Sequence, residues 1–254
     1  MLEAQLMCQT PLMPLPREGH VFNTAWPLRA SDIEPGWRLR IDGVARYLQD
    51  AGFDHLDAVS AREEHPAWVV RRTVIDSIKP IEFPGNVEVH RWCSGLSSRW
   101  CTMRARLSTA NGGLIETEGF WININPNTGL PTRITEQFEA LLGETALSNR
   151  VRWKQWITAS PGPEDESAPF PLRSTDIDVM AHVNNAVYLH AVDAALRARP
   201  ELHDTATRTV IEYLAPVAPD EKVELRTRHS SDDVHLWFVV DGNVRAQAAV
   251  LPLP

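Results

Sequence analysis

The chain repeats itself once, and this repeat constrains the fold more than any other feature. LRASDIE at residues 28–34 resembles LRSTDID at 172–178, and each is followed by a helix-like run with a Tyr-Leu pair, at 47–48 and 188–189. Further on, RTVIDSIKPI at 72–81 resembles RTVIEYLAPV at 208–217. The offset between the copies is 144 residues at the start (28 to 172), 141 at the tyrosines and 136 at the second pair of segments (72 to 208). Because the offset changes along the chain, the copies differ by short insertions, which belong in loops. Two copies are too few for a solenoid, so we expect a duplicated domain, equivalent to a fused two-fold dimer.

Each copy predicts a short strand, a helix and then several strands. Segments rich in β-branched and aromatic residues lie at 68–75, 87–92, 99–108 and 115–124, and turn-forming residues separate them at 84–86, 94–95 and 111–113. The second copy has such segments at 223–229, 234–240 and 244–251, with a hairpin turn at Asp241-Gly242. The run after His182 is apolar around nearly its whole circumference, so this helix should be buried. The expected fold class is α+β, with an antiparallel β-sheet wrapped around one long helix in each copy.

The repeat divides the chain into four parts. We expect an N-terminal tail at 1–19, a first copy at 20–145, a connecting segment and linker at 146–168, and a second copy at 169–254. The stretch 159–167 is polar and rich in Pro and Gly, which is typical of a linker. The stretch 134–156 carries apolar and aromatic residues and predicts a helix and a return segment packed on the outside.

Composition favours a soluble globular protein that binds small or acyl ligands. The chain is 43% apolar and 23% charged, and its net charge of -8 argues against nucleic-acid binding. The three cysteines lack metal-site or disulfide spacing, and neither a secretory signal nor a run of about 18 apolar residues is present. We therefore expect a cytoplasmic protein with no cofactor, no metal, and no nucleic-acid or membrane partner.

One segment of the second copy concentrates the side chains that can do chemistry. DIDVMAHVNNAVY at 176–188 places two acids, an imidazole and two amides where an apolar helix begins. Acids and amides suit a helix N-terminus, whose free N–H groups and dipole attract anions. If the segment is already helical at Asp178, the spacing of four residues puts its carboxylate and His182 on one helix face.

The structural alternatives are common ones: an aspartate that only caps a helix, a satisfied core histidine, and asparagines that satisfy backbone groups. A comparison of the copies favours function, because an acid persists in both, with Glu34 opposite Asp178, while the imidazole and amides occur only in the second. Aligning Tyr47 with Tyr188 sets Ile41, Gly43 and Val44 opposite His182, Asn184 and Asn185. The sequence therefore predicts one active copy and one that supplies architecture and pocket wall. A metal site is disfavoured because no His-x-x-x-His pair exists.

The pattern Asp-x-Asp-x-x-x-His-Val-Asn-Asn-x-x-Tyr at 176–188 resembles that of the hotdog-fold thioesterases. Two copies in one chain resemble the acyl-[acyl-carrier-protein] thioesterases of plants and bacteria, over about residues 20–254. The resemblance implies tandem hotdog folds and hydrolysis of fatty acyl thioesters to free fatty acid and carrier thiol. It makes Asp178 the catalytic carboxylate and His182 the motif histidine. From the chemistry of these residue types, we expect Asp178 to act as nucleophile or general base, and His182, Asn184 or Asn185 and helix N-terminal amides to orient the carbonyl or the water.

The resemblance breaks at three positions. Met180 stands where the plant enzymes have an asparagine, and Pro216 and Val217 stand where they have a glutamate and a cysteine. Two alternatives therefore stay open, an acyl-CoA thioesterase of the same superfamily and a non-catalytic acyl-binding or dehydratase-like hotdog protein. The expected partner is acyl carrier protein or acyl-CoA, and the sequence leaves the acyl chain length and a homodimer open.

Overall fold

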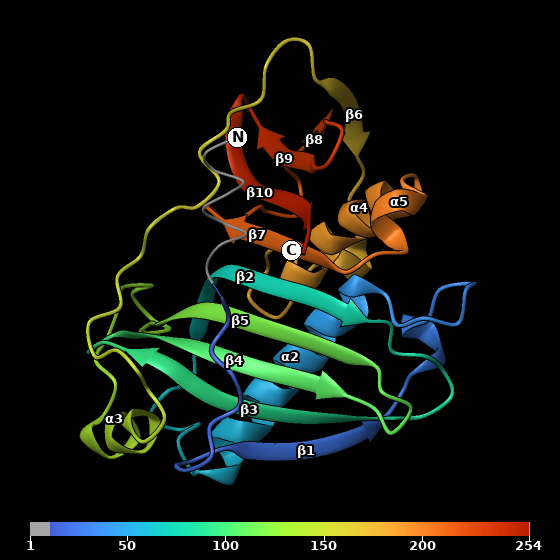
Figure 1. Cartoon of the computed structure of the whole chain (residues 1–254). Helices are drawn as coiled ribbons and strands as arrows, with labels where there is room; N and C mark the ends of the chain where they lie inside the picture. The colour runs from blue at the N-terminus through green and yellow to red at the C-terminus, as the bar shows by residue number, and fades with distance from the viewer. Residues whose placement is uncertain (1–10, 254) are drawn as a thin grey trace.

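The computed structural model describes residues 11–253, whose strands form one antiparallel sheet in the order β1-β3-β4-β5-β2-β7-β10-β9-β8-β6 (Figure 1). The first half of the chain contributes β1 (Phe22–Pro27), β2 (Trp68–Lys79), β3 (Asn86–Leu96), β4 (Trp100–Ser108) and β5 (Leu114–Asn123). The second half contributes β6 (Glu166–Phe170), β7 (Thr207–Tyr213), β8 (Val223–His229), β9 (Val234–Val240) and β10 (Asn243–Pro252).

The two halves of the sheet are arranged in mirror order about its central strands. Outward from β2 the sheet continues with β5, β4, β3 and β1, and outward from β7 it continues with β10, β9, β8 and β6. In the β2–β7 register Val74 lies opposite Val210, and these two residues are equivalent under the 136-residue offset. The strand order thus repeats the sequence duplication in space, with an approximate two-fold relation through this pair.

Two buried ion pairs join the halves across this central seam. The Nε and Nη2 atoms of Arg208 each donate to one carboxylate oxygen of Asp76 at 2.6 Å. The equivalent pair joins Arg72 and Glu212 at 3.6 Å. A one-residue shift of either strand would separate both pairs, so they favour the observed register.

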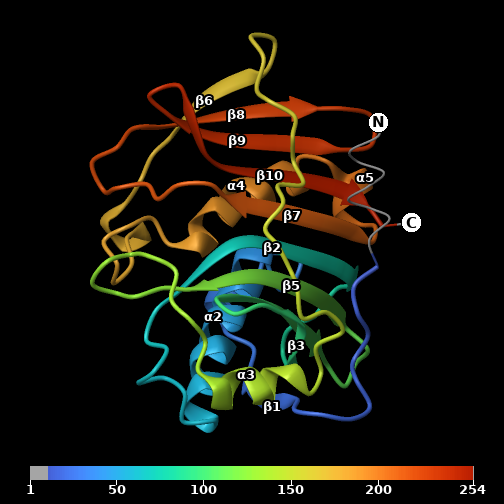
Figure 2. The same ribbon diagram turned by 90° about the vertical axis from the view of Figure 1, so that its left-hand side faces the viewer.

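The long helices α2 (Ile41–Ala58) and α4 (Asn185–Arg197) pack against each other and against one face of the sheet (Figures 1 and 2). Tyr47, Leu189 and Val192 are fully buried in the core that they share with the strands. The predicted burial of the second-copy helix is therefore confirmed. Two shorter helices are α3 (Glu136–Gly143), beside β3, and α5 (Pro200–His203), after α4. Within residues 11–253, no helix has the length and apolar character needed to cross a membrane.

The segment that connects the halves crosses the other face of the sheet (Figure 2). Ile157 is fully buried there, Arg72 stacks on the Trp156 ring, and the indole N–H of Trp237 donates to the carbonyl of Ala159 at 3.1 Å. The predicted return segment is thus packed on the outside. The polar linker expected at 159–167 is shorter than predicted, because β6 begins at Glu166.

The strands expected from composition are observed with small shifts of their ends, but one predicted turn is wrong. Ser94-Gly95 lies inside β3, where the register with β4 shifts between Cys93 and Gly95 as a β-bulge. The glycine is needed for close packing, since an added Cβ would collide with Val151 of the connecting segment and lie 2.8 Å from Thr102 Oγ1. Here the glycine within a strand pattern marks a place where another segment approaches the strand backbone closely, and not a turn.

Candidate functional site

Asp178 and His182 lie in a tight hairpin that leads from β6 into α4, and not on the helix, which begins at Asn185. The N–H of Asp178 donates to the carbonyl of His182 at 2.9 Å, and Ile177 forms an isolated antiparallel bridge with Val183. Ala181 closes the hairpin at φ 58°, and α4 begins only at Asn185. The prediction of a helical segment with the carboxylate and the imidazole on one helix face is therefore wrong. The hairpin sets the two residues opposite each other instead.

Neither aspartate of this loop caps α4. Asp176 is buried, and its Oδ2 accepts the backbone N–H of Arg173 at 2.8 Å, which closes the short 3-10 helix Ser174–Asp176. Asp178 is half-buried, and its Oδ1 accepts the N–H of Met180 at 2.8 Å and that of His182 at 3.4 Å. No residue of the described range 11–253 donates a hydrogen bond to Oδ2 of Asp178. The backbone thus holds this carboxylate by one oxygen and leaves the other able to bind water or substrate.

His182 is half-buried, and its imidazole forms no hydrogen bond with the side chains of the described part of the chain. The structure therefore does not join His182 to Asp178 through their side chains. Their contacts run through the backbone of His182. An imidazole without a protein partner can donate or accept toward a bound ligand, and catalytic hydrogen bonds often form only in the substrate complex.

The two asparagines have different surroundings. Asn184 is the N-cap of α4, because its Oδ1 accepts the N–H of Ala186 at 2.9 Å. Its amide also exchanges hydrogen bonds with Gln49 of α2, at 3.1 Å and 3.4 Å. Asn185 is the first residue of the helix, so its N–H has no intrahelical acceptor, and its carbonyl accepts the hydroxyl of Tyr213 at 3.1 Å. Asn184 therefore holds the loop against α2, while the backbone N–H of Asn185 has no acceptor among residues 11–253.

A small, mainly apolar cavity lies under α2 and reaches this loop at Asn185. Its volume is about 30 Å³, enough for about two water-sized groups. Its wall includes residues of α2 and of the strands below it, among them Ala45, Leu48, Val70, Ala105 and Thr117. Asn185 and Tyr213 come from the second half of the chain, so the cavity joins the loop of one half to the wall of the other.

Gln49 and Tyr213 are site residues that the sequence reasoning did not single out. Gln49 is the only amide in α2, and a lone amide in a helix that packs on the core is a signal of a specific partner. Tyr213 stands in the repeated strand, where the equivalent residue of the first copy is Ser77. Burial raises the pKa of Tyr213, so its hydroxyl stays protonated and donates to the start of α4.

The first half contains the same hairpin, but the alignment on the tyrosines is wrong there. The N–H of Glu34 donates to the carbonyl of Arg38 at 2.9 Å, Ile33 bridges Leu39, and α2 begins at Ile41. The hairpins therefore match with an offset of 144, which sets Arg38, Arg40 and Ile41 opposite His182, Asn184 and Asn185. Tyr47 and Tyr188 lie about one helical turn apart in their helices, so both face the core without being equivalent. The first copy still lacks the imidazole and the amides.

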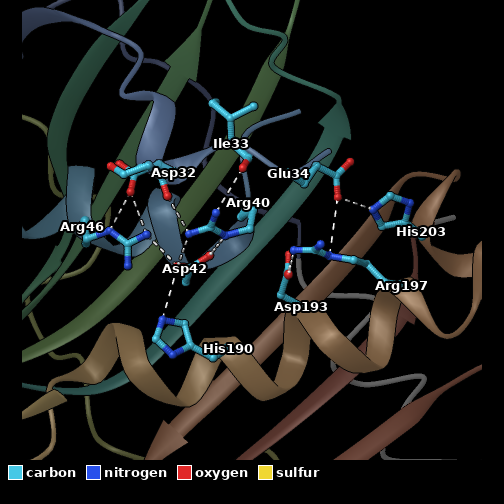
Figure 3. Close-up of polar contacts among 11 residues, drawn as sticks. Asp32, Ile33, Glu34, Arg40, Asp42, Arg46, His190, Asp193, Arg197 and His203 are labelled. Atoms are coloured by element: carbon cyan, nitrogen blue, oxygen red, sulfur yellow. Dashed lines mark hydrogen bonds and ion pairs between the residues drawn. The ribbon is translucent and has the colours of Figure 1, made fainter. Parts of the chain in front are cut away.

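In the first half the carboxylates of this region are occupied by ion pairs (Figure 3). Glu34, the equivalent of Asp178, is buried and lies 3.1 Å from Nε2 of His203 and 3.7 Å from Nε of Arg197. Burial acts to raise the pKa of Asp42, but hydrogen bonds hold it well below its usual value; the donors are His190, Arg40 and Arg46. These carboxylates hold α2, α4 and α5 together, whereas Asp178 has no ion pair among the described residues.

Family models match both halves of the chain. The acyl-ACP thioesterase N-terminal domain matches residues 19–142, and the C-terminal domain matches residues 160–250. The chain belongs to the acyl-ACP thioesterase family. It is 45% identical to an uncharacterized protein of Mycobacterium tuberculosis over 237 residues, which cover 93% of this chain and 94% of that protein.

The fold matches solved structures of this family. A 12:0-ACP thioesterase from Umbellularia californica is similar with a TM-score of 0.74 and 18% identity, covering 93% of this chain and 98% of that one. An acyl-ACP thioesterase from Bacteroides thetaiotaomicron is similar with a TM-score of 0.71 and 17% identity, covering 91% and 97%. The single large antiparallel sheet with few helices is therefore the hotdog-like fold of the acyl-ACP thioesterases.

This acyl-ACP thioesterase family member offers no acid or thiol where Pro216 and Val217 stand. The N–H of Val183 donates to the carbonyl of Val217 at 2.9 Å, so the loop after β7 lies beside the hairpin. Glu212, a few residues earlier, accepts the N–H groups of Trp156 and Ile157 in the connecting segment at 2.7 and 3.2 Å. Its carboxylate is directed to the face of the sheet opposite the helices and does not replace the missing glutamate.

Proposed function

We propose that this protein hydrolyses fatty acyl-ACP thioesters to free fatty acid and carrier thiol. The observation that carries the proposal is the free oxygen of Asp178, in the same hairpin that brings Asn185 to an apolar cavity. We also propose that the halves are two hotdog units, at 20–145 and 169–254, and that the second one is catalytic. The cavity wall from the first unit then holds the acyl chain.

A thioester carbonyl is electrophilic and its thiolate leaves readily, so the enzyme must supply an oriented nucleophile and a donor for the oxyanion. In the proposed reaction Asp178 either takes a proton from a water that adds to the carbonyl carbon or attacks that carbon itself. The carbon–sulfur bond then breaks, and the thiolate leaves with a proton returned from the solvent or the base. In the direct case water hydrolyses the acyl-Asp178 intermediate. His182 and the free N–H of Asn185, at the positive end of the α4 dipole, hold the carbonyl oxygen.

The small size of the cavity bears on how an acyl chain enters. About 30 Å³ does not hold a fatty chain, so wall side chains must move apart when the substrate binds. Met103 lines this wall, and its unbranched thioether adapts to different shapes at low cost. The acyl chain would enter beside Asn185 and extend beneath α2.

A non-catalytic acyl-binding protein is the second candidate. It is favoured by the side chains at Met180, Pro216 and Val217, none of which ionises, and by the absence of a side-chain hydrogen bond between Asp178 and His182 in the described residues. An acyl-CoA thioesterase differs from the main proposal only in the carrier of the acyl group.

The test is thiol release by the purified protein from one acyl chain carried either on acyl carrier protein or on CoA. We expect hydrolysis with a higher kcat/KM for the carrier-protein thioester. A large preference for CoA would overturn the carrier assignment alone. No hydrolysis of either thioester, together with stoichiometric binding of the acyl group, would establish the binding protein instead.

A further inference from the structure

The cavity under α2 contains a guanidinium group that has no counterion among the described residues. Arg91 of β3 lines the cavity, and its Nη1 donates to Nδ1 of His55 in α2 at 2.6 Å. Across residues 11–253, this is its one hydrogen bond, and no carboxylate lies within ion-pair distance of it. The Nε and Nη2 groups therefore have no acceptor from that part of the protein. Other core arginines differ, since Arg104 and Arg208 each pair with a carboxylate.

His55, Cys93 and Cys101 lie around Arg91 and stay neutral at pH 7, so none of these three replaces a counterion. Burial, with the charges of Arg91 and His20, lowers the pKa of His55 to about 2. Burial raises the pKa of the Cys93 thiol to about 12 and that of Cys101 well above its usual value. Burial also lowers the pKa of Arg91 to about 10, which leaves the guanidinium charged at neutral pH. Arg91 is half-buried, so water solvates its Nε and Nη2 groups, and a ligand carboxylate that enters the cavity can replace this water in charge-assisted hydrogen bonds.

A second donor in the cavity also lacks an acceptor. Trp121 of β5 lines the cavity, and no described residue accepts a hydrogen bond from its indole N–H. Gly119 makes room for this ring, because a Cβ at position 119 would collide with the indole nitrogen. The remaining wall is mainly apolar. Such a site is complementary to a ligand with an apolar stem and an oxygen acceptor for the Arg91 guanidinium.

We propose that Arg91 binds a carboxylate at the far end of the acyl chain, so that the preferred substrates are ω-carboxyacyl thioesters. The two carboxylate oxygens would accept hydrogen bonds from Nε and Nη2 in the paired geometry that guanidinium groups favour. The apolar stem would lie against Leu48, Val70 and Ala105. The inference rests on the proposed function, because the thioester end must reach Asn185 and Asp178.

The test uses N-acetylcysteamine thioesters, which carry no protein or nucleotide, in pairs of equal chain length: adipoyl and hexanoyl, suberoyl and octanoyl, sebacoyl and decanoyl. For each pair the ratio of kcat/KM for the dicarboxylic member to that for the methyl-ended member is measured. We expect the wild-type ratio to exceed one for at least one length. Arg91→Met should lower that ratio by about 10- to 100-fold, chiefly through KM, and Arg91→Lys should recover part of it.

The control is Arg62→Met, which removes an exposed guanidinium that pairs with Asp57 outside the cavity, and it should leave the ratio unchanged. If the wild-type ratio is at or below one at every chain length, the inference is overturned. Hydrolysis of the methyl-ended thioesters in the same experiment still upholds the proposed function. An unchanged ratio in folded Arg91→Met also overturns it. Hydrolysis of neither these thioesters nor the acyl-ACP and acyl-CoA thioesters overturns the proposed function, and calorimetric binding of suberate then decides the inference. If Arg91→Met does not fold, the wild-type ratio and Arg91→Lys decide it.

Discussion

The ion pair between Asp76 and Arg208 gives a sharp prediction, because it joins the halves at the centre of the sheet. Both hydrogen bonds are 2.6 Å long, and the two side chains are 8% and 3% exposed. Removing one partner of such a pair costs about 3 to 5 kcal/mol, since the other charge stays buried. Asp76→Asn keeps one oxygen acceptor, so we expect about 3 kcal/mol, or a fall in Tm of about 6 to 12 °C for a chain of this size.

Urea unfolding followed by tryptophan fluorescence measures this free energy, and a cycle with Arg208→Met should give a coupling energy of at least about 1 kcal/mol. The matched control is Asp50→Asn, whose pair with Arg29 is 44% exposed on both sides and should be worth less than about 1 kcal/mol. Equal losses in Asp76→Asn and Asp50→Asn would refute the view that the central pair holds the halves together.

Three further predictions follow from single contacts. Burial lowers the pKa of His55 to about 2, so below about pH 6.5 only the unfolded state gains this proton, and the free energy of unfolding falls by about 1.4 kcal/mol for each pH unit of acidification. His55→Gln should remove this contribution from the pH dependence measured by urea titrations between about pH 5 and 7. The same pH dependence in the wild type and in His55→Gln would contradict this prediction. Gln49→Met removes the hydrogen bonds to Asn184 and should lower the free energy of unfolding by about 1 kcal/mol. In steady-state assays it should lower kcat more than it raises KM. A change in KM alone would speak against a positioning role for Gln49. Gly95→Ala should lose about 1 to 3 kcal/mol in thermal unfolding through its collision with Val151, and a loss below about 0.5 kcal/mol would show that the connecting segment yields.

The strands and the burial of α4 were predictable because alternation and apolar runs are properties of short sequence segments. The repeat predicted which strands of the two halves are equivalent. The residues at which loops end and helices begin were harder to predict. Asp178 and Asn184 are both good helix caps by type, and only the hairpin decides that Asp178 bonds to Met180 and His182 while Asn184 caps the helix.

The alignment of Tyr47 with Tyr188 failed because a shift of about one helical turn keeps a side chain on the core side, so periodicity does not detect it. The site residues contributed by the first half depend on tertiary packing: Gln49 meets Asn184 only when α2 and α4 lie together. Arg91 has a local signal, because it continues the alternation of Val87 and Val89 toward the buried face of β3.

The role of Asp178 is the central claim, and kcat of Asp178→Asn for an acyl-ACP thioester tests it most directly. Asparagine keeps an acceptor for the N–H groups of Met180 and His182 but neither attacks a carbonyl nor takes a proton. We expect kcat to fall by about 10²- to 10⁴-fold with the Tm nearly unchanged, while Glu34→Gln, at the equivalent position of the first half, keeps its kcat. A kcat of Asp178→Asn close to the wild-type value would contradict the account.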